Sequence, residues 1–140
     1  MAQFARPNPK AVGAVSEMML MAALTKRGYT VLVPFGDNAR YDFVFEREGR
    51  FHRVQCKTGL VRDDGALVFP VCSSAAHRNG PFRTYAGEID YFGVYSPALD
   101  RCFLIPFDDL KHCKRRAVLR LEPSKNGQLK GTRTAAEYAL

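Results

Sequence analysis

The stretch YDFVFEREGRFHRVQCKTG, residues 41 to 59, decides the fold of this chain. Two short runs, Tyr41 to Glu46 and Phe51 to Lys57, alternate between apolar and polar residues, as strands with one buried face do. Between them, Gly49 can adopt the positive φ angle that a tight hairpin turn requires. The stretch therefore predicts two antiparallel strands joined by a turn within Arg47 to Arg50.

The register of this hairpin sorts its side chains onto two faces. A turn of two residues and a turn of four both place Asp42 opposite Gln55, with Lys57 diagonal to them on the same face. A carboxylate, an amide oxygen and an amine on one patch suit a metal site with a group that orients water, and the alternative is an ordinary exposed strand face. The opposite face is apolar and fit for a core; it carries Tyr41, Phe43, Phe45, Val54 and Cys56.

A long helix precedes the hairpin. Asn8 is a good N-cap, Pro9 suits the first helical position and Gly28 suits the position after the C-cap, which predicts a helix from Pro9 to Arg27. Most of its residues are apolar, so we expect it to be buried on nearly all sides. Glu17 is the exception and needs a partner, since burying a lone carboxylate is costly. That partner is either an arginine or a metal ion and water beside Asp42.

The remaining patterns complete an α/β chain of 140 residues that we expect to form one domain, residues 1–140. We expect a mixed β-sheet of about five or six strands flanked by helices, with the first helix packed across it. Thr134 and Glu137 suggest a capping box for a last short helix, and Phe107 opens another. The further strands are expected at Thr30 to Val33 (buried), Ala66 to Val71, Ile89 to Tyr95, Cys102 to Pro106 and Ala117 to Leu121.

This ordered set of motifs resembles the PD-(D/E)XK nuclease superfamily, and more narrowly its group I intron-associated endonucleases, in which glutamine can replace the acid before the lysine. The resemblance rests on NPKxxGxxSE at residues 8 to 17, GYxVxxPxG at 28 to 36, YD at 41 to 42, VQxKT at 54 to 58 and NxQ at 126 to 128. Tyr85, Gly87, Asp90 and Phe92 fit the same pattern. The resemblance implies a restriction-endonuclease-like fold.

The resemblance also implies a function and a set of site residues. It implies Mg²⁺-dependent cleavage of double-stranded DNA, with Mn²⁺ able to substitute, by a homodimer or homotetramer. Asp42 would bind the metal directly, Gln55 and the Cys56 carbonyl would add neutral oxygens, Glu17 would act directly or through water, and Lys57 would orient the attacking water. Because Gln55 is neutral, it weakens cation binding and leaves open whether a second metal ion binds. The alternatives are a Holliday-junction resolvase and an inactive DNA-binding domain.

Charge agrees with a polyanionic partner. The formal net charge is +7 and the isoelectric point is about 9.5, which favours nucleic acid, although solubility alone could account for it. A polar loop from Cys72 to Arg83 and a basic segment after Phe107 concentrate arginine and lysine. The residues expected to contact phosphates are Arg78, Arg83, Lys114, Arg115, Arg116 and Lys130.

Other acids compete for the catalytic role. Asp37 and the pair Asp63-Asp64 lie in turn sequences, so we interpret them as turn residues. Asp90 begins a strand, and we expect it to form a structural hydrogen bond or ion pair. No apolar run is long enough to span a membrane, and no signal peptide is evident. The four scattered cysteines suggest reduced thiols in the cytoplasm.

Overall fold

The computed structural model describes residues 8–73, 82–122 and 133–140. Its elements are α1 (Pro9–Lys26), β1 (Thr30–Leu32), β2 (Phe43–Arg47), β3 (Arg50–Thr58), β4 (Leu60–Val61), β5 (Ala66–Pro70), β6 (Tyr91–Ser96), β7 (Arg101–Pro106), α2 (Phe107–Leu110), β8 (Arg116–Arg120) and the 3-10 helix η1 (Ala135–Tyr138).

The predicted mixed sheet is present. Five strands lie in the order β1-β2-β3-β6-β7, and all neighbours are antiparallel except β3 and β6, which run parallel. The expectation of one sheet was incomplete, because β4, β5 and β8 form a second, antiparallel sheet. The chain leaves the main sheet at Gly59, where a Cβ atom would lie 2.7 Å from a side-chain carbon of Leu67. Only glycine permits this close approach between β3 and β5.

The hairpin has the predicted register, with Phe43 paired with Val54. The turn has two residues, Glu48 and Gly49, with φ angles of 52° and 75°. Positive φ at both positions matches the twist of the flanking strands. The strands differ in length from the expectation: β2 begins at Phe43, so Tyr41 and Asp42 precede it, and β3 extends through Thr58.

Helix α1 has the predicted ends but is less buried than expected. The Asn8 side chain accepts a hydrogen bond from the Lys10 N–H at 2.9 Å, and Gly28 has a φ angle of 89°. Only one face of α1 packs on the sheet, through Leu20, Leu24 and Ser16. The expectation of burial on all sides was wrong, because the sheet covers a single face and no other described element covers the opposite one.

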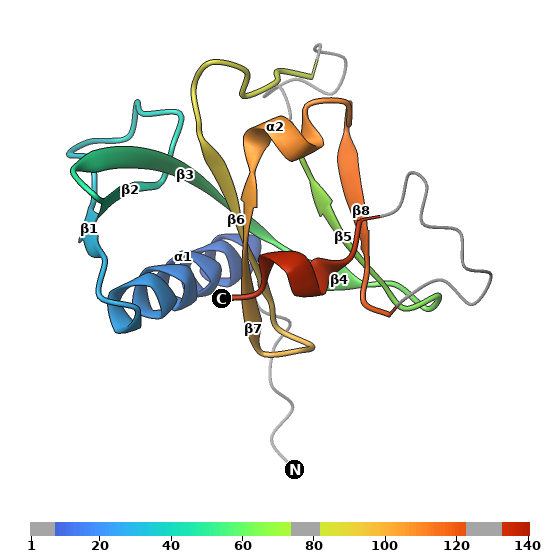
Figure 1. Ribbon diagram of the computed structural model, residues 1–140. Coiled ribbons are helices and arrows are strands. Elements are labelled where there is room, and N and C mark those ends of the chain that lie inside the picture. The colour runs from blue at the N-terminus through green and yellow to red at the C-terminus, as the bar shows by residue number, and fades with distance from the viewer. Residues whose placement is uncertain (1–7, 74–81, 123–132) are drawn as a thin grey trace.

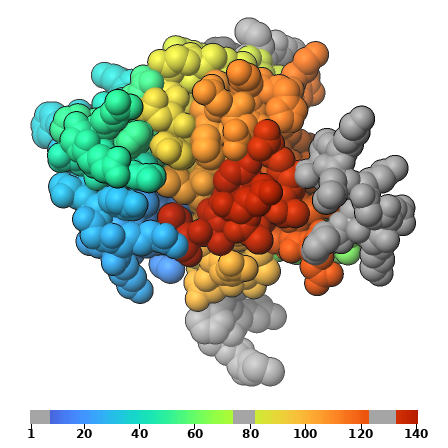
Figure 2. Space-filling model, in the orientation of Figure 1, coloured from blue at the N-terminus to red at the C-terminus, as the bar shows by residue number. Residues whose placement is uncertain are grey.

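Two further expectations fail at edges of the fold. Strand β1 is mostly exposed rather than buried, since it is the edge strand of the main sheet. Thr134 makes no side-chain hydrogen bond at the start of η1, so the capping box does not form. The segment is instead held by contacts with β7, where the Leu140 N–H donates to the Cys102 carbonyl at 3.0 Å. Figure 2 shows this C-terminal segment lying on the surface.

Two apolar cores lie on the two faces of the main sheet. One core joins α1 to β2, β3 and the adjacent strand ends through Leu20, Leu24, Phe43, Phe45, Val54, Tyr95 and Cys102. The other joins the main sheet to the second sheet through side chains that include Leu67, Phe92, Phe103 and Leu119. Figure 1 shows α1 on one side of β6 and β7 and the second sheet on the other. Strand β6 lies between two packed layers, since Phe92 and Val94 enter the core toward the second sheet and Tyr95 enters the core under α1.

Candidate active site

The candidate site lies where β2 begins. Pairing between β2 and β3 stops at Phe43 and Val54, so β3 beyond Val54 has a neighbour only on its β6 edge. Asp42 lies at the open edge: its N–H donates to the Val54 carbonyl at 2.8 Å, and its Oδ2 accepts from the Cys56 N–H at 2.7 Å. In a strand the N–H and C=O of one residue point to the same edge, so the Cys56 carbonyl also points toward this opening.

Glu17 approaches the opening from α1. The neighbouring Ser16 hydroxyl lies 2.6 Å from the Thr58 hydroxyl, which fixes this part of the helix against the end of β3. Burial raises the pKa of Glu17, and the negative charge of Asp42 raises it further. In the described part of the chain Glu17 forms no salt bridge. The alternative of a structural ion pair with an arginine therefore finds no support, and Glu17 lies within electrostatic reach of Asp42.

The carboxylate of Asp42 is incompletely neutralised. Burial raises its pKa, while the Cys56 N–H and the positive charge of Lys57 act in the opposite direction, and the net shift is upward. The Cys56 N–H holds the Oδ2 oxygen, and the Cys56 side chain also acts to lower the pKa of Asp42. Two neighbouring carboxylates with raised pKa values form a site that a cation would stabilise.

Gln55 and Lys57 lie on the opposite face of β3 from Cys56, as strand alternation requires. Within the described residues the Gln55 amide makes no hydrogen bond and stays available for a ligand. The Lys57 ammonium donates to the Tyr85 hydroxyl at 3.0 Å and lies 4.9 Å from the centre of that ring. Tyr85 is buried, so it holds the lysine in one position.

Arg40 joins this arrangement and was missed in the sequence. Its guanidinium lies 4.3 Å from the centre of the Tyr85 ring. It donates to Glu88, to the Ser73 hydroxyl and to the Thr84 carbonyl at 3.0, 3.1 and 3.1 Å. Tyr85 fitted the family pattern, but nothing local to Arg40 indicated its role, since all these contacts come from distant parts of the chain.

The cysteine at the centre of the motif presents its backbone N–H to Asp42 at the opening. The Cys56 side chain faces α1, and burial raises the pKa of its thiol well above the ordinary value, with Asp42 and Glu17 adding to the shift. The thiol therefore stays protonated and is a poor metal ligand. The carbonyl oxygen remains as the group that can bind a hard cation.

The donor set fits one divalent ion with oxygen ligands. Asp42 and Glu17 would supply charge, and Gln55 and the Cys56 carbonyl would supply neutral oxygens. Across residues 8–73, 82–122 and 133–140, no three His, Cys, Asp or Glu side chains cluster closely enough to form a metal site alone. An ion here would thus rely on neutral oxygens and on water, as the glutamine in place of an acid predicts.

Two of the competing acids, Asp90 and Asp64, have structural partners. Asp90 accepts hydrogen bonds from the Arg53 N–H at 2.8 Å and from the Arg53 guanidinium at 3.2 Å, which confirms the expected ion pair. Asp64 pairs with Arg62 at 2.6 Å within its turn. Asp37 lies exposed in a bend before β2.

The predicted phosphate-binding residues fall into three groups. Arg78 and Lys130 lie outside the described residues. Arg83 forms a salt bridge with Glu88 at 3.2 Å. The other three form an exposed basic segment at the start of β8 and make no salt bridge with described residues; they are Lys114, Arg115 and Arg116.

In the ranges that the structure describes, no helix has the length and apolar character needed to cross a membrane.

Comparison with known proteins identifies the family and the fold of this chain. A model of the PD-(D/E)XK endonuclease family matches residues 7–140. Protein 5.3 of Escherichia phage T7 is 31% identical over 83 residues, which are 56% of this chain and 70% of that protein. The bacterial homing endonuclease I-Ssp6803I has a similar structure, with a TM-score of 0.76 over 95% of this chain and 89% of that chain at 22% identity.

The structural likeness confirms the restriction-endonuclease-like fold that the sequence predicted. The match to the family model extends from before α1 to the last residue, so it includes every residue of the candidate site. The chain belongs to the PD-(D/E)XK endonuclease family.

Proposed function

We propose that this chain is a Mg²⁺-dependent endonuclease that cleaves double-stranded DNA at specific sites, and that residues 1–140 act as one nuclease domain. One observation carries the proposal: two carboxylates with raised pKa values, Asp42 and Glu17, flank the open edge of β3. The ammonium of Lys57 is near enough to offset part of the rise in the pKa of Asp42. This arrangement stores unfavourable charge that a divalent cation and a phosphate would relieve.

Each residue has a distinct part in the proposed reaction. A divalent cation would supply charge neutralisation at the phosphate. Asp42 and Glu17 would hold the cation, and the Gln55 amide and the Cys56 carbonyl would be further oxygen ligands. Lys57 has three N–H donors, and one is engaged by Tyr85. The other two orient the attacking water against the phosphorus and stabilise the negative charge that develops.

Three features support DNA as the substrate. The chain belongs to an endonuclease family, and its structural relative is titled a homing endonuclease. The net charge of +7 favours a polyanion. In the exposed segment Lys114 to Arg116 no side chain forms a salt bridge with a described residue, and Arg115 and Arg116 line the same groove as Lys57. Free thiols at all four cysteines are consistent with action in the cytoplasm.

A double-strand break by this chain requires at least two copies, since one site cuts one strand. The uncovered face of α1 suits such an assembly. Ala11, Val15, Met18 and Ala22 follow helical spacing along it, and Val15 and Met18 are 48% and 65% exposed. We therefore propose a homodimer or homotetramer that buries this face. Met18→Lys should lower the molecular mass in solution by sedimentation, and an unchanged mass would exclude this interface.

The direct test is cleavage of supercoiled plasmid. The wild-type protein should nick or linearise plasmid with Mg²⁺ or Mn²⁺ and do neither with EDTA. Cleavage without metal, or none with any metal, would contradict the proposal. The second of these outcomes would favour a non-catalytic DNA-binding domain, which the neutral Gln55 and the small number of acids also suggest. A four-way junction cut faster than linear duplex would indicate a resolvase.

A further inference from the structure

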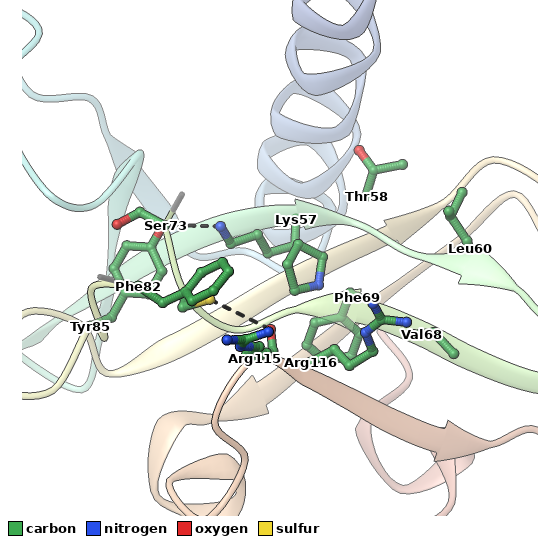
Figure 3. Close-up of a pocket in the computed structure, with 12 residues that line it drawn as sticks. Lys57, Thr58, Leu60, Val68, Phe69, Ser73, Phe82, Tyr85, Arg115 and Arg116 are labelled. Atoms are coloured by element: carbon green, nitrogen blue, oxygen red, sulfur yellow. Dashed lines mark hydrogen bonds between the residues drawn. The ribbon is translucent and has the colours of Figure 1, made fainter. Parts of the chain in front are cut away.

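A groove of about 650 Å³ begins at Lys57 and runs along the second sheet (Figure 3). Its volume is in the range of sites that hold small ligands. The residues of its lining that bear on its chemistry are Lys57, Phe82, Tyr85, Arg115 and Arg116. The catalytic machinery proposed above uses only the Lys57 end of this groove, so the rest of it has no assigned role.

The walls of the groove combine flat apolar groups with positive charge. Phe82 is 47% exposed, and the Arg115 guanidinium lies 4.2 Å from the centre of its ring. The ring is about half exposed beside this cation, so a flat ligand can contact its exposed surface. None of the described lining residues is acidic, and Arg115 and Arg116 form no salt bridge with described residues.

A flat ring attached to an anionic group is the ligand that these walls fit. A nucleotide has both, and the groove begins at the lysine that would face the scissile phosphate. The bases of an intact duplex have both faces covered by their neighbours, so a base must leave the stack to meet Phe82.

We propose that the groove receives one unpaired nucleotide next to the scissile phosphate, with its base stacked on Phe82 and its phosphate bound by Arg116. This inference rests on the proposed DNA cleavage and adds a substrate preference: DNA with an unstacked base at the cut site. Stacking of a base on an aromatic side chain strengthens binding by roughly five- to 150-fold.

The experiment compares three duplexes by fluorescence anisotropy in EDTA, where no cleavage occurs. One is fully paired, one carries a single bulged nucleotide, and one carries an abasic residue at the bulge. The wild-type protein should bind the bulged duplex about tenfold or more tightly than the paired one. The abasic bulge has the same backbone and no base, so it should bind no better than the paired duplex.

Substitutions locate the effect. Phe82→Ala should abolish the preference for the bulge and Phe82→Tyr should keep it. Phe51→Ala removes another exposed phenylalanine, 62% exposed and outside the groove, and should leave the preference intact. Phe82→Leu, which keeps apolar volume without an aromatic face, should also lose it and serves if Phe82→Ala does not fold.

Each outcome has a distinct meaning. Equal binding of paired and bulged duplexes by the wild type overturns the groove proposal, and so does a preference that survives in Phe82→Leu or that extends to the abasic bulge. Plasmid cleavage decides the other question: a protein that cuts plasmid but shows no preference retains the proposed function without this subsite. A protein that neither binds nor cuts DNA loses both.

Discussion

Two aspartates lie against the same strand, β3, but their pKa values are shifted in opposite directions. Asp42 directly precedes β2 and Asp90 directly precedes β6, and each carboxylate accepts a backbone N–H of β3, at 2.7 and 2.8 Å respectively. For both groups burial favours the neutral form. At Asp90 the hydrogen bonds and charge of Arg53 outweigh burial and hold the pKa below its usual range, whereas at Asp42 burial prevails and the pKa is raised.

We propose that this difference separates a structural carboxylate, Asp90, from a functional one, Asp42. Asp90 forms an ion pair with Arg53, and together they hold the start of β6 against β3. Asp42 has no arginine partner among the described residues and shares its surroundings with a second acid, Glu17. A carboxylate left unneutralised in a folded protein costs stability, which a bound cation can recover.

Replacing each aspartate by asparagine should break the comparison most sharply. Asp42→Asn should lower Mg²⁺-dependent plasmid cleavage by about a thousandfold, because charge neutralisation by a metal is worth several kcal/mol. Asp90→Asn should change it by no more than a few-fold. DNA binding should persist in both, since phosphate contacts lie elsewhere. Full activity in Asp42→Asn, or a thousandfold loss in Asp90→Asn, would reverse the assignment.

Lys57 and its support come next. Lys57→Met keeps the length of the side chain and removes its charge, so cleavage should fall by about a hundredfold or more. Tyr85→Phe removes only the hydroxyl that accepts from Lys57 and should cost about tenfold at most. The measurement is single-turnover cleavage, with the protein in excess of the DNA and above the dissociation constant of the protein–DNA complex. A larger loss in Tyr85→Phe than in Lys57→Met would mean that the tyrosine itself acts on the substrate.

Gln55→Glu adds the carboxylate that this site lacks. If Gln55 is a ligand, Mg²⁺ should bind about tenfold more tightly, because a carboxylate is the better hard ligand. The metal-free protein should lose stability through repulsion from Asp42, so the rise in Tm on adding Mg²⁺ should exceed that of the wild type. Identical metal-induced shifts in DNA-free samples would place Gln55 outside the site. The rate need not rise, since tighter ground-state binding does not stabilise the transition state.

The pH dependence of stability without metal should also separate the two aspartates. Because the pKa of Asp42 is raised in the folded protein, this carboxyl group contributes folding stability at pH values below its ordinary pKa of about 4. That contribution to stability is lost as the pH rises through the folded pKa. Asp42→Asn should therefore be more stable than the wild type at pH 7 and no more stable at pH 3.

For Asp90 the sign is opposite, since a lowered folded pKa gives stability present above the ordinary pKa and lost as pH falls through the folded value. Asp90→Asn should cost about 0.5–1 kcal/mol at pH 7 after solvent screening. Urea unfolding at several pH values measures both. A stability difference of the same sign for the two variants at pH 7 would contradict the comparison.

The smallest effect concerns paired and unpaired arginines. Neutralising one true phosphate contact lowers the slope of log K against log salt by about 0.9. Arg116→Gln should do so, while Arg83→Gln should change the slope less, because Arg83 is engaged by Glu88. Anisotropy titrations over a series of salt concentrations measure both slopes. A wild-type slope near zero would mean that the positive charge serves solubility alone.

The sequence by itself determined the parts of this protein that depend on neighbours along the chain. Local conformational preference and strand alternation predict a turn within Arg47 to Arg50, the pairing of Phe43 with Val54 and the caps at Asn8 and Gly28, and each is present. The choice of a two-residue turn over a four-residue one came from the structure. The family pattern added the restriction-endonuclease-like fold, since it is an ordered set of such local signals.

Tertiary structure alone decided which charges were neutralised and which surfaces were covered. The sequence does not show that Arg53 reaches Asp90 while no arginine of the described chain reaches Asp42, because ion pairing depends on positions brought together by β3 and β6. The same is true of Arg40 stacking on Tyr85, of the second sheet beyond Gly59 and of the uncovered face of α1. Burial and pairing are properties of contacts between distant segments, and those contacts exist only in the folded chain.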